Sequence, residues 1–384
     1  MGRYLWAAGL ARLADEMVAV AVVVLALSRS GSTVLSGAVI AAYTVPSILS
    51  GPLLGAWLDR TRRPVAALAA NQVALAAMAT AMVFAPAPWL VPAAFVAGVT
   101  LPMTSGGFTS LVPRLATDLP RATAQDALLF NVAAIGGPGL AGVLGTVASP
   151  AVAVAAVAAL ASAGALCTTA LRVPPHPPTE HPSLVAAMKR GLRHLVTTPP
   201  LRGATVASAV GYGSVGMLAT ALPTHLGVLG VGEDRTGLVW AAFEVGCVVS
   251  VLAVRRRLPR WRPERVVCTA IALYGVTLAL WPLTHHFPVL LGLALVSGLA
   301  QGPTLTATIT ARQRYTPGPL LGQVSTTGAS VKLGAFAIGA AGGGALLTTW
   351  STAAVILLVA AGQWVGASLG AVTSRPTRTA PVTP

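Results

Sequence analysis

Residues 55–64 read GAWLDRTRRP, and this short stretch decides how the chain must fold. It closes one long apolar segment with an aspartate and three arginines, and a second apolar segment begins directly after it. Each segment is long enough to cross a lipid bilayer, because a helix spans the hydrocarbon core with about 20 residues. Arginine-rich links this short, placed between spanning segments, are typical of proteins that cross the membrane many times.

The composition of the whole chain points the same way. Of its 384 residues, 55% are hydrophobic and 9% are charged, whereas soluble domains carry about 25% charged residues. A soluble protein of this length cannot bury so much apolar surface, so we expect lipid to cover it. The formal net charge is +15, but the basic residues lie in short links and form no compact basic domain. Attraction to anionic lipid explains this placement better, and we expect no nucleic-acid partner.

Twelve segments of the sequence are apolar over a length that spans the bilayer. A β-barrel is excluded for the bulk of the chain, because barrel strands are alternating segments of about 10 residues. The predicted fold class is all-α, a polytopic membrane protein with twelve transmembrane helices in two pseudo-symmetric six-helix bundles. The predicted spans are residues 4–27, 33–58, 65–85, 89–112, 125–147, 151–171, 203–226, 236–254, 264–284, 288–311, 322–347 and 351–372.

The basic residues predict the orientation of these spans. If the N-terminus is cytoplasmic, 21 of the 25 Lys and Arg residues fall on the cytoplasmic side. Arg29 and Arg235 then fall outside, while Arg12 and Lys332 lie within the membrane. Positive charge accumulates on the cytoplasmic side of membrane proteins. We therefore expect a multi-pass protein of the cell's inner (plasma) membrane with both termini in the cytoplasm.

The two halves of the chain resemble each other weakly. Compared at an offset of 198 residues, Arg114 aligns with Arg312 and Gln125 with Gln323. This register predicts two parallel six-helix halves, with a substrate path between them near the bilayer midplane. The predicted parts are an N-terminal six-helix bundle over residues 1–172, a cytoplasmic linker over 173–202, a C-terminal six-helix bundle over 203–372 and a disordered tail over 373–384.

The linker contains one segment with helical periodicity. Four apolar residues between Val185 and Leu195 fall on one helical face, and three basic residues fall elsewhere. This pattern predicts a short amphipathic helix on the inner leaflet. The alternative is a disordered tether between the two halves.

The opening stretch and the repeat resemble the major facilitator superfamily over essentially the whole chain. That family carries the signature G-x-x-x-D-R-x-G-R-R between its second and third helices. It is matched here by Gly55, Asp59, Arg60 and Arg63, while Arg62 stands where the family usually has glycine. The resemblance implies that this cluster latches the inner gate and does not bind substrate. Asp59 can face the positive N-terminal end of a helix from the other half, and the alternative for the arginines is a role in topology alone.

A second motif lies in the fifth span. Residues 136–142 read GGPGLAG and resemble the G-P-x-x-G-G motif that the family associates with exporters. Gly137, Pro138 and Gly142 carry the match, and Ala141 departs from it. Proline bends a helix, and glycine permits close helix packing. Small residues are common in membrane helices, so a chance match is the alternative.

Five charged residues fall near the middle of predicted spans: Arg12, Asp15, Glu16, Glu244 and Lys332. A charge at the bilayer centre costs about 2.5–3.5 kcal/mol, so such residues usually have a function. Arg12 precedes Asp15 by three residues and Glu16 by four, so either carboxylate can reach it on one helical face. If Arg12 takes one carboxylate and Lys332 another, one acid remains available to bind a proton.

We therefore expect Asp15 or Glu16 to bind a coupling proton, with Arg12 modulating it and Glu244 as the second candidate. One alternative is a static paired network that fixes helix packing. Another is direct binding of a cationic substrate by one of these acids.

Candidate cavity residues follow from the resemblance, because spans one, four, seven and ten line the path in this fold. Asn131 of the fifth span is added as a residue that can reach it. Each of these polar or aromatic residues can equally serve helix packing. The candidates are Thr104, Ser105, Phe108, Asn131, Tyr212, Gln301, Thr304 and Thr306.

The sequence carries no enzyme motif. There is no phosphate-binding loop of the Walker type, no nucleophile elbow and no metal-ligand spacing. We expect no enzyme, no metal and no cofactor other than the proton gradient. The leading interpretation is a monomeric, proton-coupled exporter of small, often lipophilic molecules. The alternatives are a proton-coupled importer of a small polar solute and a non-transporting membrane sensor or assembly protein.

Overall fold

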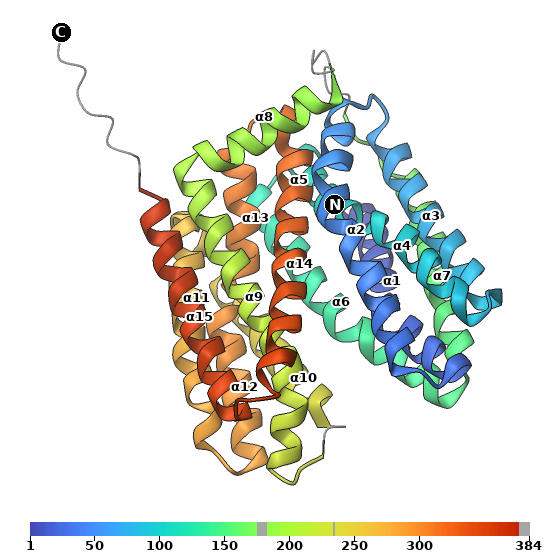
Figure 1. Cartoon of the computed structure of the whole chain (residues 1–384). Coiled ribbons are helices and arrows are strands. Elements are labelled where there is room, and N and C mark those ends of the chain that lie inside the picture. Colours follow the sequence, from blue (N-terminus) through green and yellow to red (C-terminus); the bar gives the residue numbers. More distant parts are fainter. Residues whose placement is uncertain (175–182, 233–234, 376–384) are drawn as a thin grey trace. The chain divides into compact units, whose positions relative to one another are not determined.

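The computed structural model of the chain describes residues 1–174, 183–232 and 235–375. Within these residues the chain is helical and contains no strand (Figure 1). Their contacts group the chain into two compact units. The first unit comprises Met1–Gly191 and Pro317–Ala337, and the second comprises Leu192–Thr316 and Ile338–Pro384.

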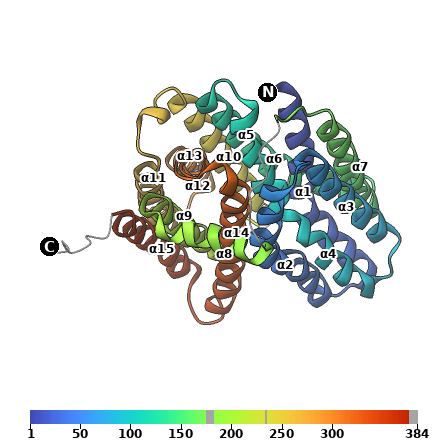
Figure 2. The ribbon, with the colours of Figure 1, turned by 90° about the horizontal axis from the view of Figure 1, so that it is seen from above.

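The first unit is built around α1, whose small residues allow several helices to pack against it. Ala7, Ala11 and Ala14 are fully buried on this helix, and α6 and α7 pack along it (Figure 2). The helices of the first unit are α1 (Gly2–Ser30), α2 (Thr33–Arg60), α3 (Pro64–Phe84), α4 (Leu90–Pro102), α5 (Phe108–Leu115), α6 (Leu119–Val147) and α7 (Pro150–Thr169), with the 3-10 turn η1 (Ala87–Trp89) before α4.

In the second unit α9 and α11 both pack against α15, as α1 and α3 both pack against α7 in the first unit. Its helices are α9 (Pro199–Val228), α10 (Thr236–Val254), α11 (Pro263–Ala279), α12 (Phe287–Gln301), α13 (Pro303–Tyr315) and α15 (Thr352–Thr373), and its 3-10 turns are η4 (Leu258–Arg260) and η5 (Trp281–Leu283). Two helices contribute to both units: α8 (Leu184–Thr197) and α14 (Leu321–Leu346), the latter preceded by the turn η6 (Gly318–Leu320).

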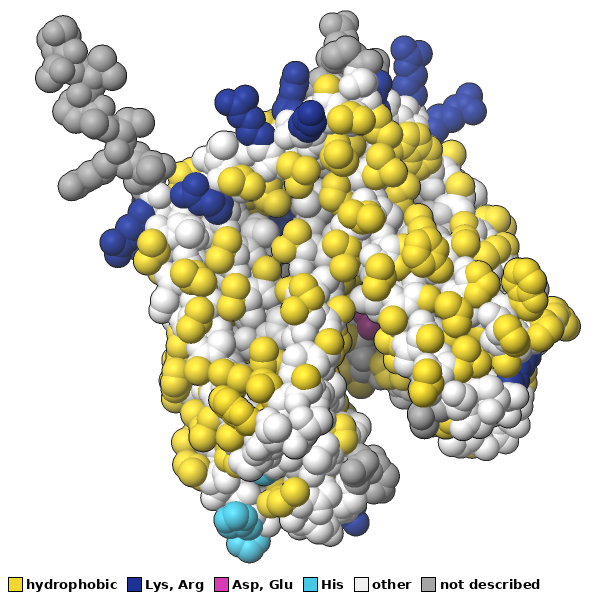
Figure 3. Space-filling model, in the orientation of Figure 1, with side chains coloured by type: hydrophobic (Ala, Val, Ile, Leu, Met, Phe, Trp, Pro, Cys, Tyr) yellow, Lys and Arg dark blue, Asp and Glu magenta, His cyan; other side chains and the backbone are white. Residues whose placement is uncertain are grey.

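The twelve predicted spans are all present as helices, with ends that differ by a few residues. Eleven of the helical segments within the described residues are long and apolar enough to cross a membrane. The helix outside that count is α1, which is equally long but carries Asp15 and Glu16 together with arginines. In each unit the exposed side chains along the helices are mainly apolar, as expected for surfaces covered by lipid (Figure 3).

One pair of contacts makes the internal repeat visible in three dimensions. In the first unit, a Cβ added to Gly98 on α4 would overlap the backbone oxygen of Tyr43 on α2. In the second unit, a Cβ added to Gly298 on α12 would overlap the backbone oxygen of Phe243 on α10. The same close helix crossing therefore occurs in both halves, about 200 residues apart. Glycine is required at both crossings, because any side chain would push the helices apart.

The linker and the tail are described in part. The helix α8 lies within the segment where an amphipathic helix is predicted. Its buried residues are Ala187, Gly191 and Leu195, whereas Val185 is 53% exposed, so the buried face is rotated from the predicted one. Residues 175–182 of the linker and 376–384 of the tail lie outside the described residues. The contacts also group Pro317–Ala337, part of the predicted C-terminal bundle, with the first unit.

Candidate functional site

The best-defined polar site of the first unit is a buried ion pair between α1 and α6. The Arg12 guanidinium lies 2.8 Å from the Asp126 carboxylate, and both side chains are at most 1% exposed. The same carboxylate accepts a hydrogen bond from the Tyr4 hydroxyl at 2.6 Å and another from Thr109 at 2.9 Å. The guanidinium also lies over the ring of Phe130, 3.6 Å from its centroid. These contacts pair the two buried charges within one network, although the Nε atom of Arg12 has no hydrogen-bond partner among the described residues.

This pair corrects the prediction that Arg12 binds a carboxylate on its own helix. Asp126 lies 114 residues away in sequence and takes the position that Asp15 or Glu16 was expected to hold. The i to i+3 and i to i+4 spacing does bring side chains to one helical face, but partners on a neighbouring helix compete for the same charge. Arg12 is therefore paired with Asp126, while it still acts electrostatically on Asp15 and Glu16 of its own helix.

Asp15 meets a tyrosine of the next helix. The Tyr43 hydroxyl on α2 donates a hydrogen bond of 2.7 Å to the Asp15 carboxylate. Tyrosine supplies a hydrogen bond without a full positive charge. Asp15 is half-buried, so the carboxylate is held by a neutral donor at mid-helix.

Glu16 packs against the exporter-type motif. A Cβ added to Gly137 on α6 would overlap Glu16 on α1, so the two helices touch at this point. Lys332 on α14 lies close enough to act electrostatically on Glu16. By contrast, an added Cβ at Gly142 would meet nothing within 4 Å. Of the motif's matching glycines, Gly137 is the one placed in tight contact, and Pro138 lies within the helix beside it.

Glu244, the remaining mid-span acid of the prediction, lies on α10 in the second unit. It is half-buried. It acts electrostatically on Cys247 of the same helix and on Tyr274 of α11.

Asp59 of the motif Gly55, Asp59, Arg60 and Arg63 binds the first turn of α14. The Asp59 carboxylate accepts hydrogen bonds from the backbone N–H groups of Gly322 at 2.7 Å and Gln323 at 2.8 Å. The first N–H groups of a helix have no partner within the helix, and a negative charge there is stabilised by the helix dipole. Asp59 therefore caps a helix that begins 263 residues later in the sequence.

The contact between α2 and α14 continues as a ladder of hydroxyl groups. The Thr326 hydroxyl donates to the backbone oxygen of Gly51 at 2.6 Å, and the Ser330 hydroxyl donates to the backbone oxygen of Ser47. A Cβ at Gly55 would overlap Thr326, so glycine at this motif position is what allows the close approach. Together with Asp59, these bonds form three successive rungs between the two helices, and we call this set the α2–α14 seam.

The arginines of the motif have different surroundings. Arg60 is half-buried, whereas Arg62 and Arg63 are exposed. Arg62 occupies the position where the signature usually has glycine. No described non-glycine residue has a positive φ angle, so the turn at Arg62 does not need glycine for its backbone conformation.

The predicted cavity residues divide into two groups. Thr104 and Phe108 are fully buried in the first unit. Thr104 accepts hydrogen bonds from Asn71 at 3.2 Å and Gln72 at 3.1 Å, and Phe108 packs edge-on against Tyr4. Both therefore serve helix packing in this structure. Of the others, Ser105, Tyr212 and Gln301 are partly buried, and Asn131, Thr304 and Thr306 are buried. Ser105 and Asn131 belong to the first unit and the rest to the second.

Two of these residues lie in an irregular turn. Met103–Gly107 forms a π-helical turn, η2, between α4 and α5. Such turns occur frequently at functional sites in helices. Here the turn brings Gly106 against the backbone of Ser325 on α14, where an added Cβ would lie 2.6 Å from the main chain. Gly106 therefore lies beside the α2–α14 seam, whereas Thr104 of the same turn faces Asn71 and Gln72 of α3.

Comparison with known proteins identifies the family. The sequence description of the Major Facilitator Superfamily matches residues 4–327. The chain belongs to the major facilitator superfamily. It is accordingly a multi-pass membrane transporter of the secondary type and not an enzyme.

Relatives of this superfamily member support the same conclusion. The chain is 29% identical over 351 residues to the uncharacterized MFS-type transporter y4rN of Sinorhizobium fredii, covering 88% of this chain and 86% of that protein. Its fold is similar to a bacterial homologue of the iron transporter ferroportin in an outward-facing state, with a TM-score of 0.77 at 17% identity over 97% of this chain and 98% of that one.

Two further superfamily structures have the same fold. The human organic anion transporter MFSD10 superposes with a TM-score of 0.75 at 16% identity, covering 97% of both chains. The proton:xylose symporter XylE superposes with a TM-score of 0.67 at 12% identity, covering 97% of this chain and 94% of that one. The names of these neighbours specify iron, an organic anion and a sugar, so the shared fold carries no information about the cargo.

One residue of the buried ion pair, Asp126, is missing from the sequence analysis. Asp126 lies two residues inside the predicted fifth span and was not counted among the mid-span charges. The sequence could have indicated Asp126, because a carboxylate within an apolar span is costly unless it has a partner. Its partner could not be named from the sequence, since Arg12 lies on a helix four spans earlier.

Proposed function

We propose that this transporter is a proton-coupled exporter of small, often lipophilic molecules that works by alternating access. It would act as a monomer in the inner (plasma) membrane, with both termini in the cytoplasm. The observation that carries the proposal is the pair of adjacent acids on α1, whose nearby arginine is already bound to Asp126. Asp15 and Glu16 are thereby left as the proton-binding candidates.

The chemistry of Asp15 suits reversible proton binding. Its carboxylate is held by the hydroxyl of Tyr43, which can donate to the charged form and can accept from the protonated form. A carboxylate bound to arginine would instead be held permanently in its charged form. Proton uptake and release at Asp15 or Glu16 would then follow the alternating access of water to the middle of α1.

The direction of transport is argued from the exporter-type motif. Gly137 of this motif contacts Glu16 directly, so a shift of α6 at Pro138 would change the surroundings of that acid. A helix bends most readily at an internal proline, because the proline removes a backbone hydrogen bond. Through this contact a change in the bend of α6 can alter the surroundings of Glu16. Because the motif resembles one that is associated with exporters, the contact favours export over import.

The α2–α14 seam would act as the latch of the inner gate. Its rungs join parts of the chain from different sequence halves. Opening toward the cytoplasm would require these hydrogen bonds to break together, and the Asp59 cap would hold them closed until the coupling acid changes its protonation state.

The test is transport in vesicles containing the purified protein, with an imposed pH gradient. Ethidium and a Hoechst dye serve as fluorescent lipophilic probes, and a proton uncoupler removes the gradient. We expect gradient-driven probe movement to be lost in the double variant Asp15→Asn/Glu16→Gln. The control variant Asp118→Asn removes an exposed acid at the start of α6 and should transport normally. Gradient-driven transport that survives in the double variant would remove both acids from the coupling role.

The alternative function is import of a small polar solute. The polar side chains of α13 favour it, because Thr304 and Thr306 are buried on this helix and can hydrogen-bond a polar molecule. Uptake of a sugar or an organic acid that is driven by an inward proton gradient, without movement of the lipophilic probes, would replace export with import.

A further inference from the structure

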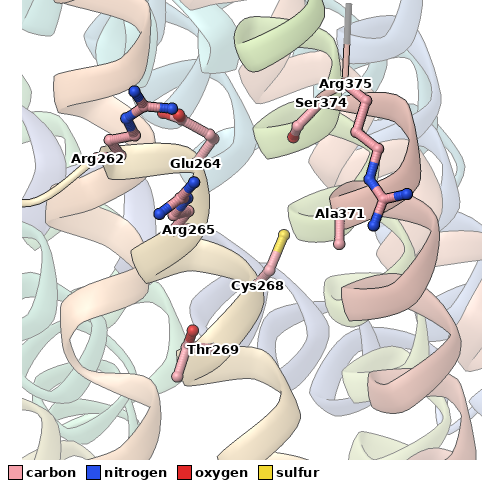
Figure 4. A pocket seen from close by; sticks show the side chains of 8 residues that line it. All are labelled: Arg262, Glu264, Arg265, Cys268, Thr269, Ala371, Ser374 and Arg375. Atoms are coloured by element: carbon pink, nitrogen blue, oxygen red, sulfur yellow. The ribbon is translucent and has the colours of Figure 1, made fainter.

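The second unit contains a basic pocket whose residues belong neither to the proposed coupling acids nor to the α2–α14 seam. It has a volume of about 460 Å³ and opens between the start of α11 and the end of α15. Its wall includes Arg262 and Arg265 from one side and Arg375 from the other (Figure 4). Nothing in the transport mechanism uses these three arginines.

The charge of the pocket is strongly positive. Glu264 is the one acid among its lining residues, and its carboxylate is already held by the Tyr315 hydroxyl at 2.8 Å and is largely buried. The three guanidinium groups are exposed to the pocket side of the helices. Guanidinium groups bind phosphate in bidentate fashion, which makes a phosphate group the chemistry that this pocket fits.

The positions of the lining residues along α11 and α15 indicate which kind of molecule carries that phosphate. The arginines lie at the helix ends, where a spanning helix leaves the hydrocarbon. Cys268 and Ala371 line the pocket about one turn deeper along α11 and α15. Figure 4 shows the Cys268 thiol between the two helices. The pocket thus has a charged end at the helix ends and a less polar end, lined by Cys268, Thr269 and Ala371, about one turn along the helices.

The apolar character continues along the same two helices. Leu273 on α11 is 53% exposed, and Leu369 and Val372 on α15 are 45% and 63% exposed. Between the helices, the Trp364 indole donates a hydrogen bond of 3.1 Å to the backbone oxygen of Ala272 and remains 43% exposed. These exposed side chains offer apolar surface on α11 and α15 for the acyl chains of an amphiphile whose phosphate lies at the arginines.

We propose that this pocket binds the phosphate headgroup of an anionic phospholipid from the leaflet on the side of the arginine-rich links. Basic pockets between membrane helices are a general means of binding anionic headgroups. The phospholipid would tie α11 to the end of α15. A soluble phosphate would use the same arginines but would gain nothing from the apolar surface below them.

The first experiment measures lipid binding to the full-length protein in detergent by native mass spectrometry. Phosphatidylglycerol and phosphatidylcholine are compared on the wild type and on the variant Arg262→Gln/Arg265→Gln/Arg375→Gln. Each arginine near a membrane surface contributes roughly fivefold to binding, so three together contribute on the order of 100-fold. We expect the wild type to prefer phosphatidylglycerol, and the variant to lose that preference.

The matched control also removes three arginines, all from the link between α10 and α11. Arg255, Arg256 and Arg257 are exposed and do not line the pocket, so their replacement by glutamine should leave the preference intact. An equal loss in both triple variants would overturn the proposal, since it would indicate attraction to charge without a pocket. The melting temperature of each variant without lipid establishes that it is folded.

A second measurement keeps all three arginines. Cys167 and Cys247 are replaced with alanine, so that Cys268 is the single thiol of the chain. We expect phosphatidylglycerol to slow labelling of Cys268 by maleimide at least several-fold, with no effect of phosphatidylcholine. Inorganic phosphate or glycerol 1-phosphate that protects Cys268 equally well would overturn the lipid assignment in favour of a soluble anion. Unchanged labelling with every probe would exclude the site.

Discussion

Replacing Asp126 with alanine should destabilise the first unit by about 3–5 kcal/mol, because it leaves the Arg12 guanidinium buried without its counter-charge. The pair is separated by 2.8 Å, and its side chains are 1% and 0% exposed. At that separation and an effective dielectric constant of about 20, the Coulomb attraction is about 6 kcal/mol. The substitution also removes the acceptor for the hydroxyls of Tyr4 and Thr109.

The prediction can be separated from a simple loss of packing. The double variant Arg12→Met/Asp126→Leu removes both charges and keeps apolar volume, so it should recover at least half of the lost stability. Recovery is expected to be incomplete, since the hydroxyls of Tyr4 and Thr109 keep no charged acceptor. In the single variant Asp126→Ala, the cation–π contact of Arg12 with Phe130 remains. It contributes about 2 kcal/mol and does not replace the hydrogen-bonded carboxylate.

The assay is equilibrium unfolding of the purified protein in detergent micelles, followed by tryptophan fluorescence. Asp118→Ala serves as the control, because Asp118 caps the start of α6 from an exposed position and its loss should cost about 1 kcal/mol. A loss below about 1 kcal/mol for Asp126→Ala would refute the reasoning. So would a double variant that is no more stable than the single one.

Two further predictions concern helix contacts. Gly98→Ala should lower the melting temperature by a few degrees, because the added methyl group meets the backbone oxygen of Tyr43 and overpacking costs about 1–3 kcal/mol. The control is Gly139→Ala, whose methyl group meets nothing within 4 Å. This control should not lower the melting temperature in the same thermal scan. Asp59→Asn should change the rate of probe transport in vesicles by severalfold, because it removes the charge that caps α14. Asp118→Asn, which changes an exposed aspartate cap outside the seam, should keep its transport rate. Equal rates in both variants would exclude the latch.

Much of the fold could be predicted from the sequence because the bilayer imposes a local rule. Every span must supply about 20 apolar residues in succession, and each link must interrupt them. The predicted span 65–85 corresponds to α3 (Pro64–Phe84), and the predicted span 236–254 corresponds to α10 with the same ends. The glycine crossings at Gly98 and Gly298 repeat at an offset of 200 residues, two more than the offset of 198 used in the sequence comparison.

The site was predicted less completely, and the reasons are physical. Asp15 and Glu16 could be singled out because charge is costly in the membrane, wherever its partner lies. The Asp59 rung of the seam matches the expectation that Asp59 faces the N-terminal end of a helix from the other half. The two hydroxyl rungs could not be foreseen, since Thr326 and Ser330 resemble any other small polar residues of a membrane helix. Their hydroxyls matter because α2 passes close enough to accept from them.

The sequence by itself determined the class of this protein, its spans and the residues that carry charge into the membrane. These properties depend on composition over short stretches, which the bilayer selects directly. Tertiary structure decided which partner each charge has: Arg12 binds Asp126, 114 residues away, and Asp59 caps α14, 263 residues away. A carboxylate in a low-dielectric interior binds whichever donor the packing of helices brings to it, and packing depends on the whole chain.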